Sequence, residues 1–339
     1  MTASKEFSVT SSRGVVADPR PVISVVVPLY NEQAVIREFH KRLLQVLLGT
    51  RETFEIIYVN DGSRDDSLRI VHELSEGDFR VSYIDLSRNF GKESAMTAGL
   101  DFSCGDAVVV IDADLQDPPE IIPQMIARWR EGYDNVYATR SRREGETLLK
   151  RATASLFYQV IGRLSNVGIP ADTGDFRLLS RRAVDALTQL REQHRFMKGL
   201  FAWIGYDGIA VEYDRDSRFA GESKFNYLKL WNFAMEGITS FSIAPLKIST
   251  YLGGAVALLA STFGCVILVK TLLIGNPVPG YASLICSILF LGGVQLMAIG
   301  MLGEYIGRMF NQTKNRPLYF VKTHHRVSSK DVPAVADYQ

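Results

Sequence analysis

The sequence has few cysteines, and their number and spacing argue against a disulfide framework. Only three are present, Cys104, Cys265 and Cys286, and no two of them have the spacing of metal-binding cysteines. Isolated cysteines of this kind usually behave as small apolar residues and indicate a reducing compartment. The sequence therefore predicts neither a disulfide-stapled domain nor a cysteine-based metal site.

The sequence also lacks an excess of charge of either sign. Its formal net charge is +1, so bulk electrostatics indicates no nucleic-acid or other polyanionic partner. No GxGxxG motif follows the first expected strand, and GxxxxGK[ST] occurs nowhere. These absences argue against a dinucleotide-dependent oxidoreductase and against a P-loop enzyme.

The first twenty residues contain no long apolar core. They are rich in Ser, Thr and Val without periodicity, which predicts a disordered tail and no signal peptide. We therefore expect the catalytic part of the chain to remain in the cytoplasm.

Charged residues almost disappear between 248 and 302, where Lys270 is the only one. A stretch of this length holds two membrane spans of about 20 residues each. We expect these spans at about Ile248–Leu272 and Ala282–Leu302. Basic residues precede the first span and follow the second, so the positive-inside rule places both flanks in the cytoplasm. Just before the spans, residues 225–241 predict an amphipathic interfacial helix.

Short apolar runs alternate with amphipathic stretches from residue 21 to residue 139, which predicts a parallel, doubly wound α/β sheet. Strands are expected at Val22–Val27, Phe54–Val59, Val81–Leu86, Ala107–Ile111 and Asn135–Thr139, and helices at Glu32–Leu48, Asp65–Ser75, Lys92–Phe102 and Pro119–Glu131. Unusual polar segments follow the first three strands, at 28–32, 60–63 and 87–92. Because the carboxyl ends of parallel strands share one edge, we expect a nucleotide there. For 60–63 alone, ordinary turn chemistry is the alternative.

The fourth expected strand ends in three oxygen-bearing side chains, Asp112, Asp114 and Gln116. Alternation along an extended chain puts them on one side, where they can converge on one ligand. Carboxylate and amide oxygens suit Mg²⁺ or Mn²⁺ bound together with phosphate groups. The alternative is a polar strand end at which Asp117 caps the following helix.

Two basic groups and one carboxylate follow residue 139. The basic groups contain Arg140, Arg142, Arg143, Lys150 and Arg151, and then Arg215, Arg218 and Lys224. Each is either a solvated face or a phosphate site for one of two substrates. Between them, Asp175 is expected in a tight turn, where it either caps the helix expected near 181–190 or has a functional role.

Four segments together resemble family 2 glycosyltransferases of the GT-A fold: VPLYNE at 27–32, NDGS at 60–63, DADLQD at 112–117, and 218–224. RNFGKE at 88–93, GDFR at 174–177, the two-span tail and LGEYIGR at 302–308 are similar, more narrowly, to bactoprenol glucosyltransferases and other polyprenyl-phosphate glycosyltransferases. The resemblance covers about 22–321. It implies a metal-dependent enzyme that transfers a sugar, with glucose from UDP-glucose as the first candidate, to undecaprenyl phosphate with inversion.

The resemblance also implies roles for individual residues. The metal, Mg²⁺ or Mn²⁺, would be held by Asp112, Asp114 and Gln116. The donor pocket would be lined by Pro28, Tyr30, Glu32, Asp61, Lys92 and Asp112. Donor or lipid phosphates would meet Arg140, Lys150, Arg218, Ser223 and Lys224. Asp114 and Asp175 would be catalytic. The acceptor is a phosphate monoester with a second pKa of about 6, so near neutral pH it is already mostly ionised. Asp175 is therefore either a base of modest importance or an orienting group.

The predicted organisation has five parts: a tail at 1–20, a GT-A domain at 21–222, juxtamembrane helices at 223–244, two transmembrane helices at 245–303 and a cytoplasmic tail at 304–339. The resemblance implies a homo-oligomer, such as a tetramer, in the plasma (inner) membrane with both termini in the cytoplasm. One alternative keeps the chemistry with another donor sugar or a dolichyl-type lipid. The other is a membrane-anchored scaffold that binds nucleotide-sugar without turnover.

Overall fold

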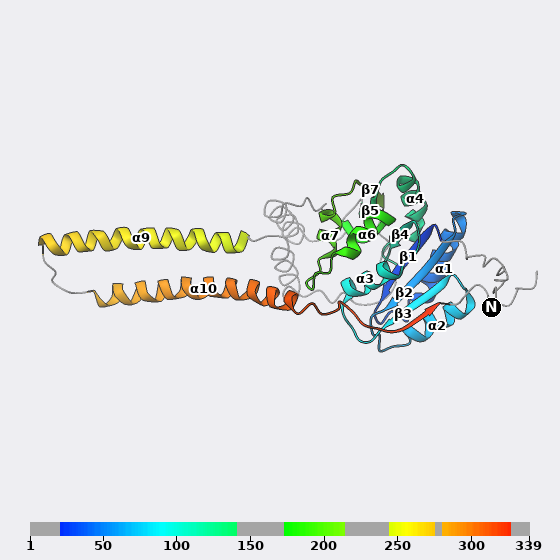
Figure 1. The fold of residues 1–339 in the computed structure, drawn as a ribbon, viewed down its shortest axis with the longest axis horizontal. Coiled ribbons are helices and arrows are strands. Elements are labelled where there is room, and N and C mark those ends of the chain that lie inside the picture. Colours follow the sequence, from blue (N-terminus) through cyan, green and yellow to red (C-terminus); the bar gives the residue numbers. More distant parts are fainter. Residues whose placement is uncertain (1–20, 141–172, 214–243, 275–279, 327–339) are drawn as a thin grey trace, which may run out of the picture.

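A computed structural model of the chain describes residues 21–140, 173–213, 244–274 and 280–326. These residues form a globular domain and a hairpin of two long helices that extends away from it (Figure 1). The predicted tail at 1–20, the predicted interfacial helix, and Lys150, Arg218, Ser223 and Lys224 lie outside the described residues.

The domain is built on one eight-stranded sheet with the strand order β7-β5-β6-β4-β1-β2-β3-β8. Its strands are β1 (Ile23–Leu29), β2 (Phe54–Asn60), β3 (Val81–Leu86), β4 (Ala107–Val110), β5 (Asn135–Arg140), β6 (Thr173–Ser180), β7 (Gly208–Tyr213) and β8 (Val321–Arg326). Strands β1 to β4 are mutually parallel, whereas β6 runs antiparallel to β4 and β5, and β8 antiparallel to β3. The predicted mainly parallel sheet is confirmed, and the five predicted strands all form.

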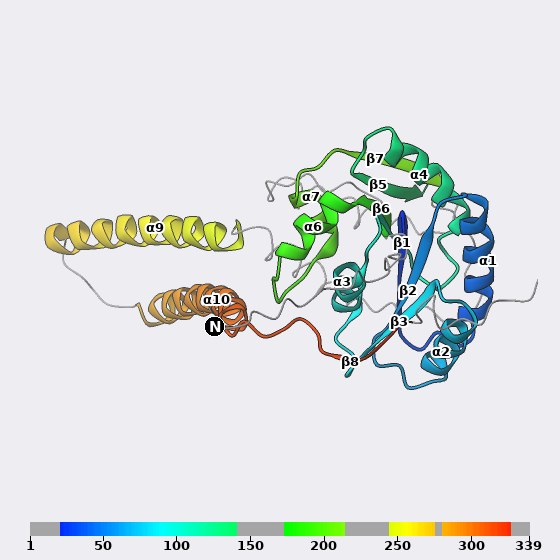
Figure 2. The ribbon, with the colours of Figure 1, turned by 45° about the vertical axis from the view of Figure 1, so that its right-hand side comes forward.

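Helices cover both faces of the sheet (Figure 2). Core contacts place α1 (Ile36–Gly49), α2 (Ser67–Gly77) and α4 (Ile122–Arg130) on one face, and α3 (Lys92–Phe102), α6 (Arg181–Gln189) and α7 (Met197–Trp203) on the other. Along β1, Val25 and Val27 join the first core while Val26 joins the second. Alternating side chains of a strand point to opposite faces, so a strand covered on both sides is apolar throughout.

The segment that follows the hairpin returns to the sheet, which the sequence analysis did not predict. It forms β8 beside β3, with His325 stacked on Tyr83 and Lys322 Nζ 3.5 Å from Asp85 Oδ2. The strand is polar and mostly exposed, because only one of its edges is paired. Residues beyond the hairpin are therefore part of the globular domain.

The hairpin consists of α9 (Ala244–Ile274) and α10 (Tyr281–Thr313), which contain the two predicted spans. Large apolar side chains are exposed along both helices, among them Leu258, Phe263 and Leu296. Within the described residues, one stretch, Phe290–Thr313, has the length and the mean hydropathy, 1.3, of a membrane-crossing helix. Exposed apolar surface on this scale indicates a lipid environment.

Candidate active site

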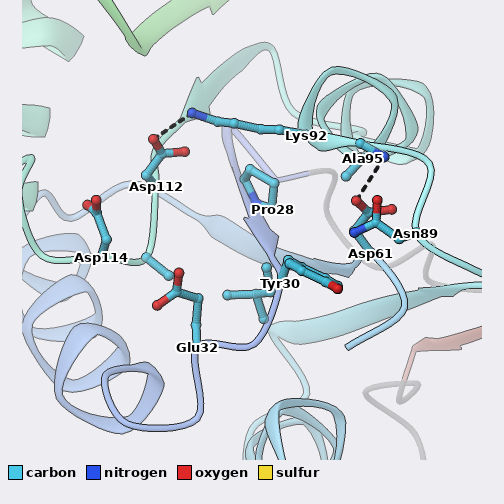
Figure 3. A pocket seen from close by; sticks show the side chains of 12 residues that line it. Pro28, Tyr30, Glu32, Asp61, Asn89, Lys92, Ala95, Asp112 and Asp114 are labelled. Carbon is cyan, nitrogen blue, oxygen red and sulfur yellow. Dashed lines mark hydrogen bonds and ion pairs between the residues drawn. The ribbon is translucent and has the colours of Figure 1, made fainter. Parts of the chain in front are cut away.

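A pocket of about 430 Å³ opens at the carboxyl ends of the parallel strands β1, β2 and β4 (Figure 3). It is lined by Pro28, Leu29, Tyr30, Glu32, Asp61, Asn89, Gly91, Lys92, Ala95, Asp112, Ala113 and Asp114. All six residues predicted for the donor pocket are in this set, together with Asp114. Its volume lies in the usual range for small-molecule sites, roughly 300–1,000 Å³.

The loop after β1 is fastened to the loop after β2 by paired hydrogen bonds. The Asn31 N–H donates to Ser63 Oγ at 3.0 Å, and the Arg64 N–H donates back to Asn31 Oδ1 at 2.8 Å. The Glu32 N–H donates to Ser67 Oγ at 2.9 Å. These bonds occupy the segment expected to begin the first helix, so α1 begins at Ile36 instead of Glu32. They hold Glu32 at the pocket.

Asp61 connects the loop after β2 to the loop after β3. Its Oδ1 accepts the Phe90 N–H at 2.7 Å and its Oδ2 accepts the Gly91 N–H at 2.9 Å. Burial raises the pKa of Asp61, while these two bonds and nearby Arg88 oppose the rise. Turn chemistry is present as well, because the Ser63 N–H donates to Asn60 Oδ1 at 3.3 Å. Asp61 thus lines the pocket and also positions the loop after β3.

Asp112, Asp114 and Gln116 are partly exposed between buried neighbours, as alternation predicts. The backbone turns at Leu115, whose φ is +60°, and the Gln116 N–H donates to Asp114 Oδ1 at 3.1 Å. Gln116 is consequently not among the lining residues. Within the described residues, no group of three or more His, Cys, Asp or Glu side chains forms a metal site. Two carboxylates at the pocket still fit Mg²⁺ or Mn²⁺ chemistry, since such ions take further ligands from phosphates and water.

Asp117 does not cap a helix. Its side chain is buried and accepts a hydrogen bond from the Tyr213 hydroxyl, and the short 3₁₀ turn Pro119–Ile121 that precedes α4 has no side-chain cap. The alternative explanation of Asp117 is therefore wrong, because Pro118 separates it from the helix and its carboxylate packs against β7.

Asp175 lies inside β6, not in a tight turn as expected, and it does not cap α6. The cap of α6 is Ser180, whose hydroxyl accepts the Ala183 N–H. Lys92 joins Asp175 to the pocket, with its Nζ 2.6 Å from Asp112 Oδ2 and 2.5 Å from Asp175 Oδ2. Figure 3 shows Lys92 reaching across to Asp112 from the amino end of α3. The antiparallel register of β6 against β4 places the two carboxylates at the same edge.

The charged groups around Lys92 shift one another's pKa values. Burial raises the pKa of Asp112 to about 6, with Lys92 opposing the rise and Asp175 adding to it. Burial and the charge of Asp175 raise the pKa of Glu93 to about 8. Burial alone would raise the pKa of Asp175, but Lys92 and Lys198 lower it below its ordinary value. Asp175 is thus ionised near neutral pH, and its buried Oδ1 has no hydrogen-bond partner among the described residues.

The five residues predicted to bind phosphate are only partly placed. Arg140 ends β5, whereas Lys150, Arg218, Ser223 and Lys224 lie outside the described residues. The sequence analysis missed Asn89 and Ala95 in the pocket and Arg177 and Lys198 near Asp175. Asn89 lies within the RNFGKE segment and Arg177 within GDFR, so these short motifs were the available signal.

Comparison with known proteins places these features in one family. Residues 24–188 match the family described as glycosyl transferase family 2, and residues 244–309 match the GtrB C-terminal hairpin. A glycosyltransferase of Synechocystis sp. named sll0501 is 52% identical over 88% of this chain and 94% of its own length. The SfII prophage-derived bactoprenol glucosyl transferase of Shigella flexneri is 49% identical over 90% of this chain and 98% of its own. A prophage bactoprenol glucosyl transferase homolog of Escherichia coli K12 is 47% identical over 88% and 98%.

Proposed function

The chain belongs to glycosyltransferase family 2, with the GT-A fold and a GtrB-type C-terminal hairpin, and on that premise we propose that it transfers glucose from UDP-glucose to a polyprenyl phosphate. Relatives at 47–49% identity that span nearly the whole chain are named bactoprenol glucosyl transferases or their homologue, which supports both the glucosyl group and the lipid acceptor. Undecaprenyl phosphate is the acceptor we propose.

The observation that carries this proposal is the crevice at the carboxyl edge of the sheet. Three fastened loops bring Tyr30, Asp61 and Asn89 together around a volume that suits a nucleotide-sugar. Lys92 then connects this crevice to Asp175, which is 83 residues away in the sequence. A donor site and a second charged centre therefore share one edge of the sheet, as transfer between two substrates requires.

In the proposed reaction, a phosphate oxygen of the acceptor attacks C1 of the sugar while the bond from C1 to the donor diphosphate breaks. The electron pair of that bond leaves with the nucleoside diphosphate, and C1 is inverted. A phosphate monoester is mostly ionised near pH 7, so it needs positioning more than deprotonation. Because Asp175 is itself ionised and paired with Lys92, we assign it an orienting role, with Oδ1 available to accept a donor hydroxyl.

We propose that Asp112 and Asp114 hold a divalent cation, Mg²⁺ or Mn²⁺, on the donor diphosphate. When bound, this ion would neutralise charge that develops on the departing diphosphate. Lys92 contributes a fixed positive charge at the same edge and keeps Asp112 and Asp175 from repelling each other. Gln116 positions Asp114 through its backbone N–H in the described structure.

We further propose that α9 and α10 anchor the enzyme in the plasma membrane, with the globular domain and both termini in the cytoplasm. The basic residues that flank the hairpin support this orientation. The proposed assembly is a homo-oligomer, such as a tetramer. Protease accessibility of Arg316 in intact cells tests the orientation: cleavage from the outside would invert the topology.

The experiment that tests the reaction is a radiolabel transfer assay with full-length protein in detergent, undecaprenyl phosphate, Mg²⁺ or Mn²⁺, and single nucleotide-sugars. We expect UDP-glucose to label the lipid phase and EDTA to abolish the labelling. Labelling from a different donor would replace glucose in the proposal, and labelling of dolichyl phosphate alone would replace the lipid. Binding of nucleotide-sugar without transfer or hydrolysis would instead indicate the scaffold alternative.

A further inference from the structure

A second, smaller pocket lies between the sheet and α7, and neither the comparisons nor the motif residues assign it a ligand. We call it the α7 pocket. Its lining includes Tyr137 of β5, Thr173 and Arg177 of β6, and Lys198 and Phe201 of α7. Its volume is about 190 Å³, below the usual range for sites that hold a whole small molecule. The pocket has room for a compact group and not for a nucleotide-sugar.

The α7 pocket is lined by two cationic side chains and has no carboxylate among its lining residues. Asp175 and Glu93 attract both Lys198 and Arg177 electrostatically from outside the pocket. Arg177 is 3% exposed and lies 3.6 Å over the Phe201 ring. Two of its nitrogens donate to Gly174 O at 3.0 Å and to Asn135 Oδ1 at 3.4 Å, whereas Nε has no partner. A buried guanidinium with an unpaired nitrogen is costly, so the site favours an anionic ligand.

The pocket lies near Asp175 and shares no lining residue with the donor crevice. Thr173, Asp175 and Arg177 alternate along β6 and share one face. Asp175 meets the donor crevice through Lys92, while Thr173 and Arg177 line the α7 pocket. The acceptor has to bind apart from the donor, and the α7 pocket is a separate site near Asp175. Figures 1 and 2 also show α7 on the side of the domain from which the hairpin extends.

We propose that the α7 pocket binds the phosphate group of the lipid acceptor, with Lys198 and Arg177 as its cationic ligands. This inference rests on the proposed function and adds an acceptor site to it. The guanidinium and ammonium groups match the charge of a phosphate monoester. Burial lowers the pKa of Lys198, with Asp175 opposing the decrease, and an anion in the pocket would raise it again.

The test measures equilibrium binding of decyl phosphate, a soluble phosphate monoester, to the full chain in detergent by calorimetry, with UDP binding measured in parallel. We expect Lys198→Gln to weaken decyl phosphate binding about 10- to 100-fold, the size of a lost charge-assisted hydrogen bond. Lys198→Arg should restore most of the affinity, and UDP binding should be unchanged in both. Lys41→Gln, which removes an exposed charge from α1 on the far face, is the matched control.

Three outcomes would overturn the proposal. The first is equal decyl phosphate affinity in wild type and Lys198→Gln, and the second is a loss of UDP affinity with decyl phosphate binding intact. The third is inorganic phosphate or decanol binding as tightly as decyl phosphate, since either result would remove the lipid phosphate as the specific ligand. A wild type that transfers no sugar to any lipid would refute the proposed function, while the binding result would still decide the α7 pocket.

Discussion

The replacement Asp61→Asn tests whether one buried carboxylate holds the donor pocket together. Asp61 is 3% exposed, and both of its oxygens accept backbone N–H groups from Phe90 and Gly91. Asn keeps one acceptor and presents an NH₂ group to the other N–H. The loss of a charge-assisted hydrogen bond costs about 1.5–3 kcal/mol, and the donor left without a partner adds about 1–3 kcal/mol.

Part of this cost is offset, because burial of the ionised Asp61 is itself unfavourable and raises its pKa. We therefore expect a net loss of about 2 kcal/mol, which corresponds to a roughly 30-fold change in an equilibrium constant. The loop at Phe90 and Gly91 borders the pocket, so this loss should appear in ligand affinity and in thermal stability.

The assay compares UDP affinity by calorimetry with the unfolding temperature in detergent. The matched control is Asp66→Asn at an exposed ion pair with Arg69, which should leave the unfolding temperature almost unchanged. An unchanged unfolding temperature together with UDP affinity within threefold of wild type would refute the role of Asp61. A lower unfolding temperature with intact UDP affinity would show that the loop bond stabilises the fold without shaping the site.

Four further predictions concern the same edge of the sheet. Gly62→Ala should lower the unfolding temperature and weaken UDP binding, because φ is +65° and the new Cβ would lie 2.6 Å from backbone atoms of Arg88 and Asn89; Gly49→Ala, with nothing within 4 Å, is its control. Lys92→Met should reduce the rate of sugar transfer at pH 7 at least about 100-fold, since Asp112 and Asp175 would face each other without a cation, and Lys92→Arg should retain more of the rate. The transfer rate should fall as pH drops through about 6, where Asp112 binds a proton, and a profile without this acid limb would contradict the assignment. Because the folded-state pKa of Asp112 is raised above the ordinary 3.8, its contribution to stability should increase as pH falls from about 6 to 4, and Asp112→Asn should remove that increase in unfolding temperature.

The local pattern of the sequence determined the strands and the edge at which the pocket forms. Apolar runs such as Ala107–Val110 are buried on both faces, and the polar residues that follow them meet at the carboxyl ends of parallel strands. The residues expected to line the donor pocket were predictable for this reason: each lies at or shortly after the carboxyl end of a strand, or begins a helix. Hydropathy likewise located the two helices of the hairpin.

The tertiary structure decided which charges meet across long separations in the chain. Whether Lys92 pairs with Asp175 depends on β6 running antiparallel to β4, and no local pattern specifies that pairing. The same holds for β8, since a polar, edge-paired strand has no apolar signal to reveal it. The α7 pocket depends on α7 packing over the sheet, because that packing brings Lys198 of α7 close to Arg177 and Asp175 of β6.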